Sequence, residues 1–487
     1  PGLLGAALAH SAARADPRIE PERCIWSWGD NAHCQCLVDA SAAATLPAPQ
    51  LVACRRPMRS LAAGWESTLL IDSAGSLWGG GSNRGGCLSE EDGEAPRRLT
   101  RLDLAELDGV PFEAAQAGRD HALAVLEGGR AVVSWGPSNE FGQLGHGSAQ
   151  AAKVRPGVVL LSGVAVKQVA CGEFHSLILT VQGEVFAFGS NTHGALGTGR
   201  RDPLEQAQKV NAQHLRGVPV RGIAAGAQSS MALSIGGQVF CWGCNAHGRL
   251  GLGPSYDGEE AVLSPVVVPG LPGMARAIAA GGRHSAALLR KGRLFLAGDN
   301  RAGQLGQPRA DIDSTSTFYE LPFHDYTLRV RTVALGGAHT CILSYDGELY
   351  ACGDNAAGQL GISCHAGRAP PPLAVDVPVR VAFGAEGDER SFVVVGIAAC
   401  HNHTVALALS VPACSRVLSV GKAAATGRPQ TSAVMNGRPA GGHGRHAATG
   451  DLGAHFRGSS LGGCGLGGGL DGGVLRLASA DGLLGPA

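Results

Sequence analysis

The sequence contains few aromatic and few charged residues. Aromatic side chains make up 5% of the chain and charged ones 16%, whereas apolar residues reach 44%. A chain with this apolar content can bury a large core, which it has to build from small side chains rather than from rings. The composition therefore excludes a mostly disordered polymer.

An excess of charge of either sign is also missing. Forty lysine and arginine residues balance forty aspartate and glutamate residues, so the formal net charge is zero. Without a global field to hold a polyanion, we expect no direct contact with nucleic acid. The longest charge-free stretch, residues 222–248, is interrupted by glycines and by polar residues such as Gln228 and Ser229. We predict no membrane span.

Motifs of common enzymes are missing from the repeats described below. There is no Gly-x-Ser-x-Gly elbow, no phosphate-binding Gly-Lys-Ser/Thr loop and no His-Glu-x-x-His helix. We therefore expect no hydrolase, transferase or oxidoreductase chemistry and no cofactor.

The fourteen cysteines do not form a recognisable metal or disulfide pattern. Cys241 and Cys244 have the spacing of half a zinc knuckle, but no second pair lies at a suitable distance. Five cysteines stand in strand-like segments as small apolar residues, namely Cys171, Cys241, Cys341, Cys352 and Cys400. We predict no metal site and a reducing compartment, the cytoplasm or the nucleus.

Glycine is abundant, with 74 residues, and it marks a repeat. A Gly-x-Asn pattern, one residue longer in its third copy, recurs at intervals of 52 to 55 residues and mostly continues into Gly-Gln-Leu-Gly or a near copy. The seven copies begin at Gly29, Gly81, Gly136, Gly189, Gly243, Gly298 and Gly353. A period of this length indicates a repeat architecture.

A second pattern, Gly-x-x-His or Gly-x-x-Ser, keeps the same period about 17 residues ahead of the first. Its copies end at Ser67, His121, His175, Ser229, His284 and His339, with a degenerate seventh copy at His401 and His403. A catalytic histidine is needed once, so five histidines in equivalent places indicate a structural role, namely hydrogen bonding at a tight strand entry.

Each repeat reads as β-structure. His175–Thr180 and Glu184–Gly189 are β-rich runs joined by a glycine turn, which predicts a hairpin. No segment of the repeats keeps a 3.6-residue apolar period for long, so helices are at most short insertions. Two stretches, Pro308–Tyr326 and Cys364–Phe392, interrupt the repeat and are expected to project as loops.

The two ends of the array indicate that it closes into a ring. The first Gly-x-Asn has no Gly-x-x-His strand before it, and the last such strand, His403–Leu407, has no Gly-x-Asn after it. The two half-units complete each other, which is how propellers avoid unpaired edges. We predict an all-β, seven-bladed propeller over residues 22–410, a poorly ordered segment at 1–21 and a Gly/Ala-rich disordered tail at 411–487.

The combination of Gly-x-Asn-x-x-Gly-Gln-Leu-Gly with a Gly-x-x-His strand resembles the regulator-of-chromosome-condensation repeat, from Trp26 to Leu409. The resemblance implies a seven-bladed propeller. Propellers of this family serve as guanine-nucleotide exchange factors, as a light sensor, and as partner-binding modules in larger ligases and kinases, so fold alone does not choose among these activities.

Residues inside the Gly-x-x-His turns vary between repeats and therefore carry our prediction of a binding site. Equivalent turns lie on one face of a propeller, where charged and aromatic side chains suit a protein partner. The predicted contact set is Trp65, Glu66, Arg119, Asp120, Glu173, Phe174 and Arg283. In relatives that act as exchange factors, an acidic residue just before the histidine of one turn matters for exchange, and Asp120 is its match. The alternative is that Asp120 is only a solvated turn residue.

The other activities of the family are disfavoured by the residues present. Ultraviolet-B photoreceptors of this fold place tryptophans in turns of consecutive late blades, where this chain has Ala227, Gly282 and Gly337. A ligase is disfavoured because the tail is of low complexity and does not look like a catalytic domain. A chromatin role is disfavoured because the sequence shows no basic N-terminal arm. We expect a monomer that acts through protein contacts as an exchange factor for a small GTPase. The alternative is a non-catalytic scaffold that uses the same face or the stretch 308–326.

Overall fold

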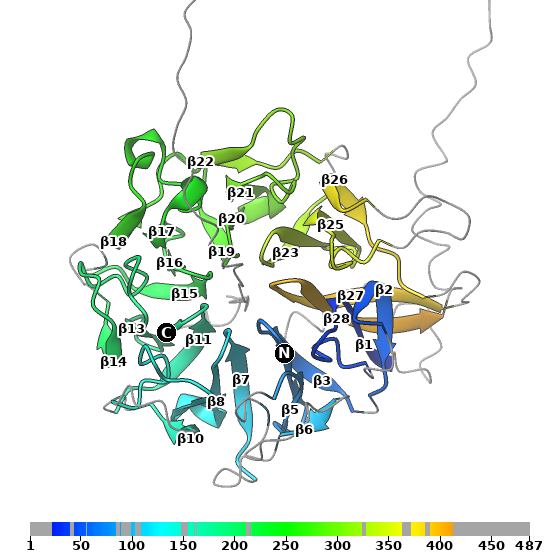
Figure 1. The fold of residues 1–487 in the computed structure, drawn as a ribbon, viewed down its shortest axis with the longest axis horizontal. Coiled ribbons are helices and arrows are strands. Elements are labelled where there is room, and N and C mark those ends of the chain that lie inside the picture. The colour runs from blue at the N-terminus through cyan, green and yellow to red at the C-terminus, as the bar shows by residue number, and fades with distance from the viewer. Residues whose placement is uncertain are drawn as a thin grey trace, which may run out of the picture. The chain divides into compact units, whose positions relative to one another are not determined.

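The computed structural model describes residues 22–412, except 39–42, 55, 84–87, 89–98, 103–108, 148–153, 160, 162, 211–214, 216, 324–327, 363–371 and 385–389. The segments predicted to be disordered, 1–21 and the tail, lie outside the described residues apart from the first two residues of the tail. The described part forms seven four-stranded antiparallel sheets arranged as the blades of a propeller (Figure 1).

Within each blade the strands follow one another from the propeller axis outwards. The innermost strands are β3 (Met58–Ala63), β7 (Phe112–Ala117), β11 (Val166–Cys171), β15 (Val220–Ala225), β19 (Ala275–Ala280), β23 (Val330–Leu335) and β27 (Arg390–Cys400). The second strands are β4 (Ser67–Asp72), β8 (Ala122–Leu126), β12 (His175–Thr180), β16 (Ser229–Ser234), β20 (His284–Leu289), β24 (His339–Ser344) and β28 (His403–Pro412).

The outer half of each blade contains the other two strands. The third strands are β5 (Leu77–Gly81), β9 (Val132–Gly136), β13 (Val185–Gly189), β17 (Val239–Cys244), β21 (Leu294–Asp299), β25 (Leu349–Asp354) and β1 (Glu22–Asp30). The outermost strands are β6 (Thr100–Arg101), β10 (Val154–Val158), β14 (Leu204–Lys209), β18 (Ala261–Val267), β22 (Ser314–Glu320), β26 (Ala374–Arg380) and β2 (Thr45–Val52). We number the blades 1 to 7 from the one that begins with β3 to the one that begins with β27.

The N-terminal strand closes the ring in blade 7. Strand β1 pairs with β28, with Trp26 opposite Ala406 and Gly29 opposite His403, and the sheet order is β2-β1-β28-β27. This confirms the predicted closure by N- and C-terminal strands in one blade. The rings of Trp26 and Phe392 pack edge to face at 5.0 Å inside this blade and help to hold strands β1 and β27 together.

The predicted hairpins are confirmed, and the helices are single turns. His175–Thr180 pairs with Val185–Gly189, as predicted from the glycine turn between them. Among the described residues the 3₁₀ turns are η4 (Glu127–Gly129), η5 (Ala246–Gly248), η6 (Pro254–Tyr256) and η7 (Arg290–Gly292). None of the described helices is long and apolar enough to reach across a membrane.

The prediction that 308–326 and 364–392 project as loops was wrong for their central parts. Ser314–Glu320 is strand β22 and Ala374–Arg380 is strand β26, each the outermost strand of its blade. Residues of both strands are half-buried or exposed, so neither shows the buried alternation by which a strand is recognised in a sequence.

The core lies between neighbouring blades. Side chains of β7 and β8 pack on those of β11 and β12, for example Ala114 and Leu123 with Val169 and Ile178. The innermost strands are rich in alanine, as in β15 and β19, because blades converge towards the axis and leave room for small side chains only. This packing accounts for the scarcity of aromatic residues.

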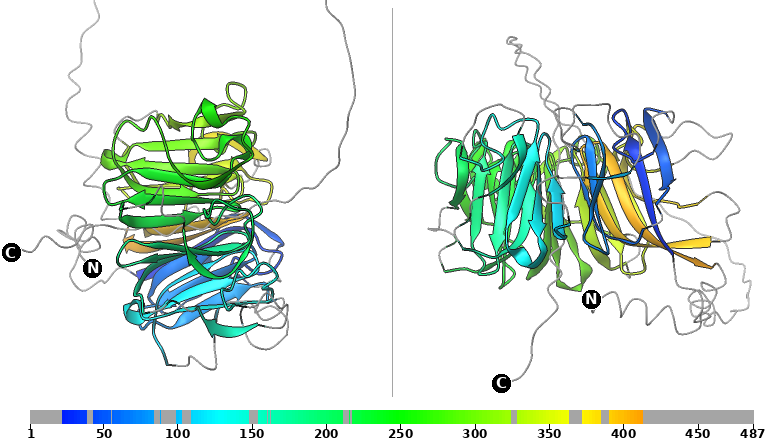
Figure 2. Two further views of the ribbon diagram at one scale, coloured as in Figure 1. Left: turned by 90° about the vertical axis from the view of Figure 1, so that its left-hand side faces the viewer. Right: turned by 90° about the horizontal axis from the view of Figure 1, so that it is seen from below.

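Each second strand begins at a Gly-x-x-His turn and ends at a hairpin, so the turns and the hairpins lie on opposite faces of the ring. Figure 2 shows the blades from the side. We call these the turn face, with the Gly-x-x-His turns, and the hairpin face. The hairpins that define the latter are residues 72–75, 127–129, 181–183, 235–237, 290–292 and 345–347.

Candidate functional site

The turns of neighbouring blades are joined by backbone hydrogen bonds into a belt around the propeller axis. The amide of a turn residue donates to a carbonyl of the next blade's turn, as in Glu173 N to Ala227 O at 2.9 Å. The other links run from Trp65 to Gly118, Arg119 to Glu173, Ala227 to Gly281, Gly282 to Gly336, and Gly337 to His401. At the junction of blades 7 and 1, the His401 and Trp65 rings stack at 4.0 Å. We call this ring of turns the turn belt.

The repeated histidines form a second set of hydrogen bonds between neighbouring blades, next to the belt. Each bonds through Nε2 to a hydroxyl in the next blade, and His175 Nε2 lies 3.0 Å from Ser230 Oγ. The equivalent pairs are His121 with Ser176, His284 with Thr340, His339 with Thr404, and His403 with Thr68. The structural role expected for these histidines is thus what the structure shows.

The hydroxyl partners determine which ring nitrogen is protonated. Ser230 Oγ donates its one proton to the Ala195 carbonyl at 2.7 Å, so His175 Nε2 has to be the donor towards Ser230. A single proton on Nε2 is the neutral form of the ring. Burial lowers the pKa of His175 to about 4 and that of His121 to about 3, which agrees with neutral rings at neutral pH.

On top of the belt, Arg119 organises an aromatic and ionic cluster. Its guanidinium lies 4.7 Å from the centre of the Trp65 ring and 5.3 Å from that of Phe174. The same group donates to Glu173 Oε1 at 2.6 Å. Arg119 is exposed, whereas Glu173 is buried and needs a cation to compensate its charge. We call Trp65, Arg119, Glu173, Phe174 and His401 the Arg119 cluster.

Neighbouring side chains extend this cluster in both directions. Gln228 Nε2 of blade 4 lies 3.5 Å from Glu173 Oε2, and the Phe141 ring packs at 5.2 Å on Phe174. Glu66, beside Trp65, approaches His33 Nε2 at 3.5 Å. The arrangement joins blades 7, 1, 2, 3 and 4 in one network of contacting side chains, of which Arg119 is exposed. Since aromatic rings and arginine are the side chains most enriched at binding hot spots, the surface suits a protein partner.

Asp120 directly follows Arg119 in the turn of blade 2. Its side chain is half-buried, and its carbonyl contacts the backbone at Gly136, where an added Cβ would lie 2.3 Å from it. This close approach leaves no room for a side chain at position 136, so the backbone of Asp120 lies directly against the end of β9.

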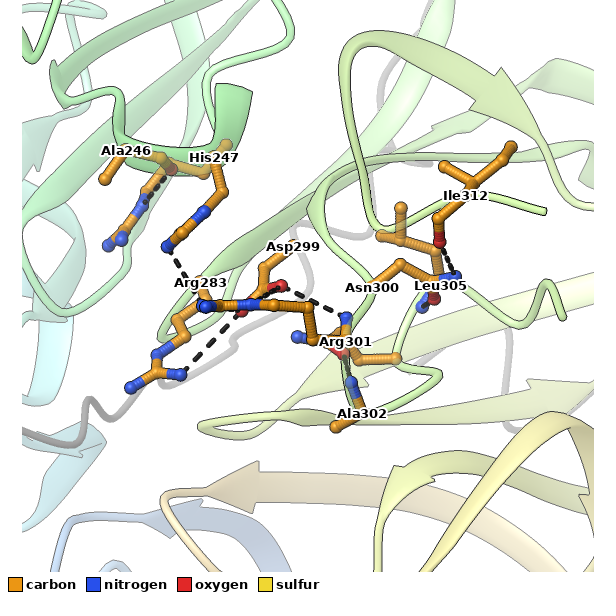
Figure 3. A network of polar contacts seen from close by, with 11 residues as sticks. Ala246, His247, Arg283, Asp299, Asn300, Arg301, Ala302, Leu305 and Ile312 are labelled. Atoms are coloured by element: carbon orange, nitrogen blue, oxygen red, sulfur yellow. Dashed lines mark hydrogen bonds and ion pairs between the residues drawn. The ribbon is translucent and has the colours of Figure 1, made fainter. Parts of the chain in front are cut away.

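A second polar cluster occupies the turn face at blades 4 and 5 (Figure 3). Asp299 is buried at the end of β21, and Arg301 clamps it with both Nε and NH2 at 2.9 Å. Arg283 NH1 approaches the same carboxylate at 3.8 Å, and Arg301 also bonds His247 Nε2 at 3.0 Å. Burial alone raises the pKa of Asp299, but the hydrogen bonds and charge of Arg301 outweigh it and hold that pKa below its usual range.

A further cationic group lies beside this second cluster. Arg249 is buried, and its NH1 donates to the Gly282 carbonyl at 2.7 Å. Burial lowers the pKa of His247, and Asp299 opposes that shift. The cluster therefore presents more positive than negative groups around one carboxylate.

The structure separates the predicted contact residues into two places. Trp65, Arg119, Glu173 and Phe174 form one cluster, Glu66 and Asp120 are the chain neighbours of Trp65 and Arg119, and Arg283 belongs to the second cluster. Trp65 and Glu173 are 8% and 4% exposed, so in the unbound protein they support Arg119 rather than face solvent. Their direct contact with a partner stays a prediction.

Sequence reasoning did not select several members of these clusters. They are His33, Phe141, Gln228, His247, Arg249, Asp299, Arg301 and His401. His401 was visible as a departure from the repeat, because it stands where glycine is expected. The acidic residue of Gly298-Asp299-Asn300 was visible as part of the Gly-x-Asn pattern, but its arginine and histidine neighbours could not be read from that pattern.

The described residues contain no group of three or more histidine, cysteine, aspartate or glutamate side chains placed to hold a metal ion. Cys241 and Cys244 both lie in strand β17 as buried free thiols. Burial raises the pKa of the Cys241 thiol, which makes it a poor metal ligand or nucleophile.

Family models place the chain among known proteins. The regulator of chromosome condensation (RCC1) repeat matches residues 131–179, 182–233, 236–288 and 346–407, and a second model of the same repeat matches 166–195, 220–249, 275–304 and 330–359. The chain belongs to the RCC1 repeat family. The resemblance inferred from the glycine and histidine patterns is thereby confirmed.

Curated RCC1-repeat relatives include receptors and ligases. The chain is 31% identical to the ultraviolet-B receptor UVR8 of Arabidopsis thaliana over 65% of this chain and 70% of the receptor. It is 36% identical to the human probable E3 ubiquitin-protein ligase HERC6 over 56% of this chain but only 26% of the ligase. The similarity to HERC6 therefore concerns a part of that protein.

Solved structures of RCC1-type propellers superpose on the chain. Human WBSCR16 matches with a TM-score of 0.68 and 25% identity, covering 79% of this chain and 99% of that one. Prp20p of Saccharomyces cerevisiae matches with a TM-score of 0.70 and 20% identity, covering 86% and 98%. The likeness to Prp20p shows the fold alone.

Proposed function

We propose that this RCC1-repeat propeller binds a small GTPase with its turn face and accelerates release of GDP. The observation that carries the proposal is the Arg119 cluster on the turn face, with Asp120 directly after Arg119 in the same turn. The structure of Prp20p was described with its binding to Gsp1p and histones, which supports protein binding by a propeller of this shape.

Rigid presentation favours tight binding. The belt hydrogen bonds and the histidine–hydroxyl pairs hold seven turns in one arrangement before any partner arrives. Little conformational entropy is then lost when the side chains are covered. Arg119, which is exposed, already lies over two aromatic rings, so it is oriented for a partner's carboxylate or carbonyl groups.

Exchange of this kind requires no chemistry from the propeller. A protein that binds the nucleotide-free GTPase more tightly than the GDP-bound form must, by linkage, weaken the binding of GDP to the same extent. Asp120 is the group that we expect to act on the nucleotide site, because a carboxylate there would repel phosphate and compete for a cation that the phosphate needs. The other residues of the predicted contact set would supply affinity.

The test is release of a fluorescent GDP analogue from a panel of small GTPases in the presence of the full chain. We expect acceleration with at least one of them, and a loss of roughly tenfold or more in the Asp120→Ala variant. The control variant Asp346→Ala removes an exposed carboxylate from the hairpin face. It should accelerate GDP release from the GTPase as much as the unmodified chain does. Equal activity of both variants would contradict the role of Asp120.

A scaffold function is the second candidate. It is favoured by an open groove of about 400 Å³ beside the turn face, lined among others by His247, Tyr256, Glu259 and Glu260 and by residues of β22. A partner that spans this groove and the second cluster would bind without touching Asp120. Binding of a GTPase with no change in GDP release, or no binding to any GTPase, would leave the scaffold as the function to pursue.

A further inference from the structure

The innermost strand of each blade contains a β-bulge on the side of the hairpin face. In β15 the register shifts between Val220 and Gly222, so Arg221 has no partner across the ladder. The residues in this position, blade by blade, are Arg59, Glu113, Lys167, Arg221, Arg276, Arg331 and Val395. Because the bulge lies at the same place in each innermost strand, these seven residues stand at equivalent positions around the axis, next to the hairpin face.

Bulge side chains reach from blade to blade. Arg221 NH2 donates to the Ala275 carbonyl at 2.7 Å, directly before Arg276. Arg276 NH2 in turn donates to the carbonyls of Val330 at 2.8 Å and Arg331 at 2.7 Å. Arg59 donates to the Phe112 carbonyl in the same way. Such bonds to backbone carbonyls orient the guanidinium groups without neutralising their charge.

Four consecutive blades carry a cation at this position. Lys167, Arg221, Arg276 and Arg331 of blades 3 to 6 form what we call the basic arc. Burial lowers the pKa of Lys167, and the positive charge of Arg221 lowers it further. Burial also lowers the pKa of Arg221, with the charges of Arg290 and Arg276 acting in the same direction. In the described part of the chain, neither Lys167 nor Arg221 forms an ion pair with a carboxylate.

Large apolar side chains are exposed around the basic arc. Val181, Ile235, Met274 and Tyr345 are 56%, 59%, 53% and 55% exposed. They lie on the same face, because the amide of Val181 donates to Ala165, next to the start of β11, and those of Ile235 and Tyr345 donate to the equivalent residues of their own blades. The Arg276 guanidinium lies 5.5 Å from the centre of the Tyr345 ring, which joins the two kinds of residue directly.

Blades 1 and 2 differ at the same positions. At the position of Val181, Ile235 and Tyr345 these blades have Ser73 and Glu127, and blade 2 has Glu113 at the bulge. Blade 5 has Arg290 at that position, and its exposed apolar residue is Met274. Blade 1 keeps a cation, Arg59, but lacks the apolar hairpin residue. The combination of cationic and exposed apolar groups therefore lies on one side of the hairpin face. Neither packing within the blades nor the proposed exchange activity on the opposite face requires this asymmetry.

We propose that the hairpin face of blades 3 to 6 is a second protein-binding surface, which takes an acidic segment of a partner whose carboxylates reach the basic arc and whose apolar side chains cover Val181, Ile235, Met274 and Tyr345. Arginine forks and a lysine at successive blades match carboxylates spaced along an extended chain. A nucleic acid would use the cations but gain little from aliphatic side chains, so the combination favours protein.

The test measures binding of the full chain to a fluorescein-labelled synthetic peptide of alternating glutamate and leucine by fluorescence anisotropy. A glutamate–serine peptide, a lysine–leucine peptide and a short DNA duplex serve as comparison probes. We expect binding of the glutamate–leucine peptide, roughly tenfold weaker binding of the glutamate–serine peptide and none of the lysine–leucine peptide. Equal affinity for the DNA duplex would identify a general polyanion site and overturn the proposal.

Variants locate the binding on the surface. Reversal of charge in the Lys167→Glu/Arg221→Glu double variant should weaken peptide binding roughly tenfold or more, while Arg130→Glu, an exposed arginine of blade 2 on the same face, should leave it unchanged. Val181→Ser and Ile235→Ser alter exposed side chains, so they should fold normally and weaken binding several-fold. Unchanged binding in all of these variants would overturn the proposal.

The outcome is independent of the proposed exchange function. The same variants should accelerate GDP release from the GTPase as much as the unmodified chain does, because every substitution lies on the hairpin face. Loss of peptide binding with normal GDP release would support two separate surfaces. Failure of the exchange assay would leave the peptide result interpretable.

Discussion

At the scale of single residues, the turn face depends on compensated charge. Glu173 is 4% exposed, and its carboxylate lies within reach of Arg119 and Gln228. A carboxylate at this depth stabilises the fold only while a cation accompanies it, because desolvation of an unpaired charge costs several kcal/mol. The carboxylate of Asp299, which is buried at blade 5, has its charge compensated in the same way by Arg301 and Arg283.

Removal of Arg119 should therefore destabilise the protein more than loss of a surface ion pair. We expect Arg119→Ala to lower the free energy of unfolding by about 2 kcal/mol, because Glu173 is left buried and charged. Adding Glu173→Gln to the Arg119→Ala variant should recover part of that loss, because it removes the buried charge. Urea unfolding of the two single variants and the double variant measures the coupling.

The control for this cycle is the pair Arg293–Glu320, in which both side chains are more than 40% exposed. Its disruption by Arg293→Ala should cost less than about 1 kcal/mol. A loss in Arg119→Ala no larger than in Arg293→Ala would mean that Glu173 is compensated by other groups.

At the scale of elements, each blade is shaped by contacts between its turn and the end of its third strand. Gly189 ends β13 with φ +104°, and a Cβ there would lie 2.5 Å from the Phe174 carbonyl. The amide of the next residue, Ser190, donates to that carbonyl at 2.8 Å. Glycine is needed here for both the backbone conformation and the close approach, which explains its regular recurrence in the sequence.

Gly189→Ala should be far more disruptive than alanine at a glycine of similar conformation in open space. Gly163 has φ +67°, and a Cβ added there would meet no atom within 4 Å, so Gly163→Ala should cost about 1 kcal/mol, from the backbone alone. Gly189→Ala adds a clash with backbone and should cost about 3 kcal/mol or more. Thermal and urea unfolding of the two variants compare them, and equal losses would show that the strand end can shift.

At the scale of the whole molecule, five buried histidines link neighbouring blades through their Nε2 atoms. Burial lowers their pKa values to about 3 for His121, His339 and His403 and to about 4 for His175 and His284. In the unfolded chain the same rings would have a pKa of ~6.5. The ring of blades therefore excludes protons that the unfolded chain would bind.

The stability of the propeller should fall as the pH drops below about 6.5. Above that pH the histidines are neutral in both states, and below it only the unfolded chain takes up protons, so each histidine removes up to ~1.4 kcal/mol per pH unit until its folded pKa is reached. Urea midpoints at pH 7.5 and 5.5 should differ strongly. His175→Gln keeps a side-chain donor towards Ser230 but does not titrate, so it should reduce the proton uptake on unfolding by about one.

A pH-independent midpoint across this window would mean that the histidines bind protons equally in the folded and the unfolded protein, contrary to the effect expected from their burial. A midpoint that depends on pH to the same degree in His175→Gln and in the unmodified chain would exclude His175 as one of the groups responsible.

The sevenfold repeat, the β-class and the closure of the ring can all be derived from the sequence. These features follow from local requirements: glycines at turns, β-rich runs between them, and half-units at both ends of the array. Asp120, Arg119, Glu173 and Phe174 were also visible as variable residues of the turns. The outermost strands, such as β22 and β26, were missed because one edge of each is exposed and their side chains are not alternately buried.

Which side chains meet depends on the folded ring. Arg119 reaches Glu173 from a turn 54 residues away, and Trp65 meets His401 across the junction of blades 7 and 1. The basic arc likewise depends on the position of a bulge in each innermost strand, because a shift of one residue would point these side chains to the other side of the sheet. Contacts between residues one repeat apart depend on register and blade spacing, which no local pattern contains.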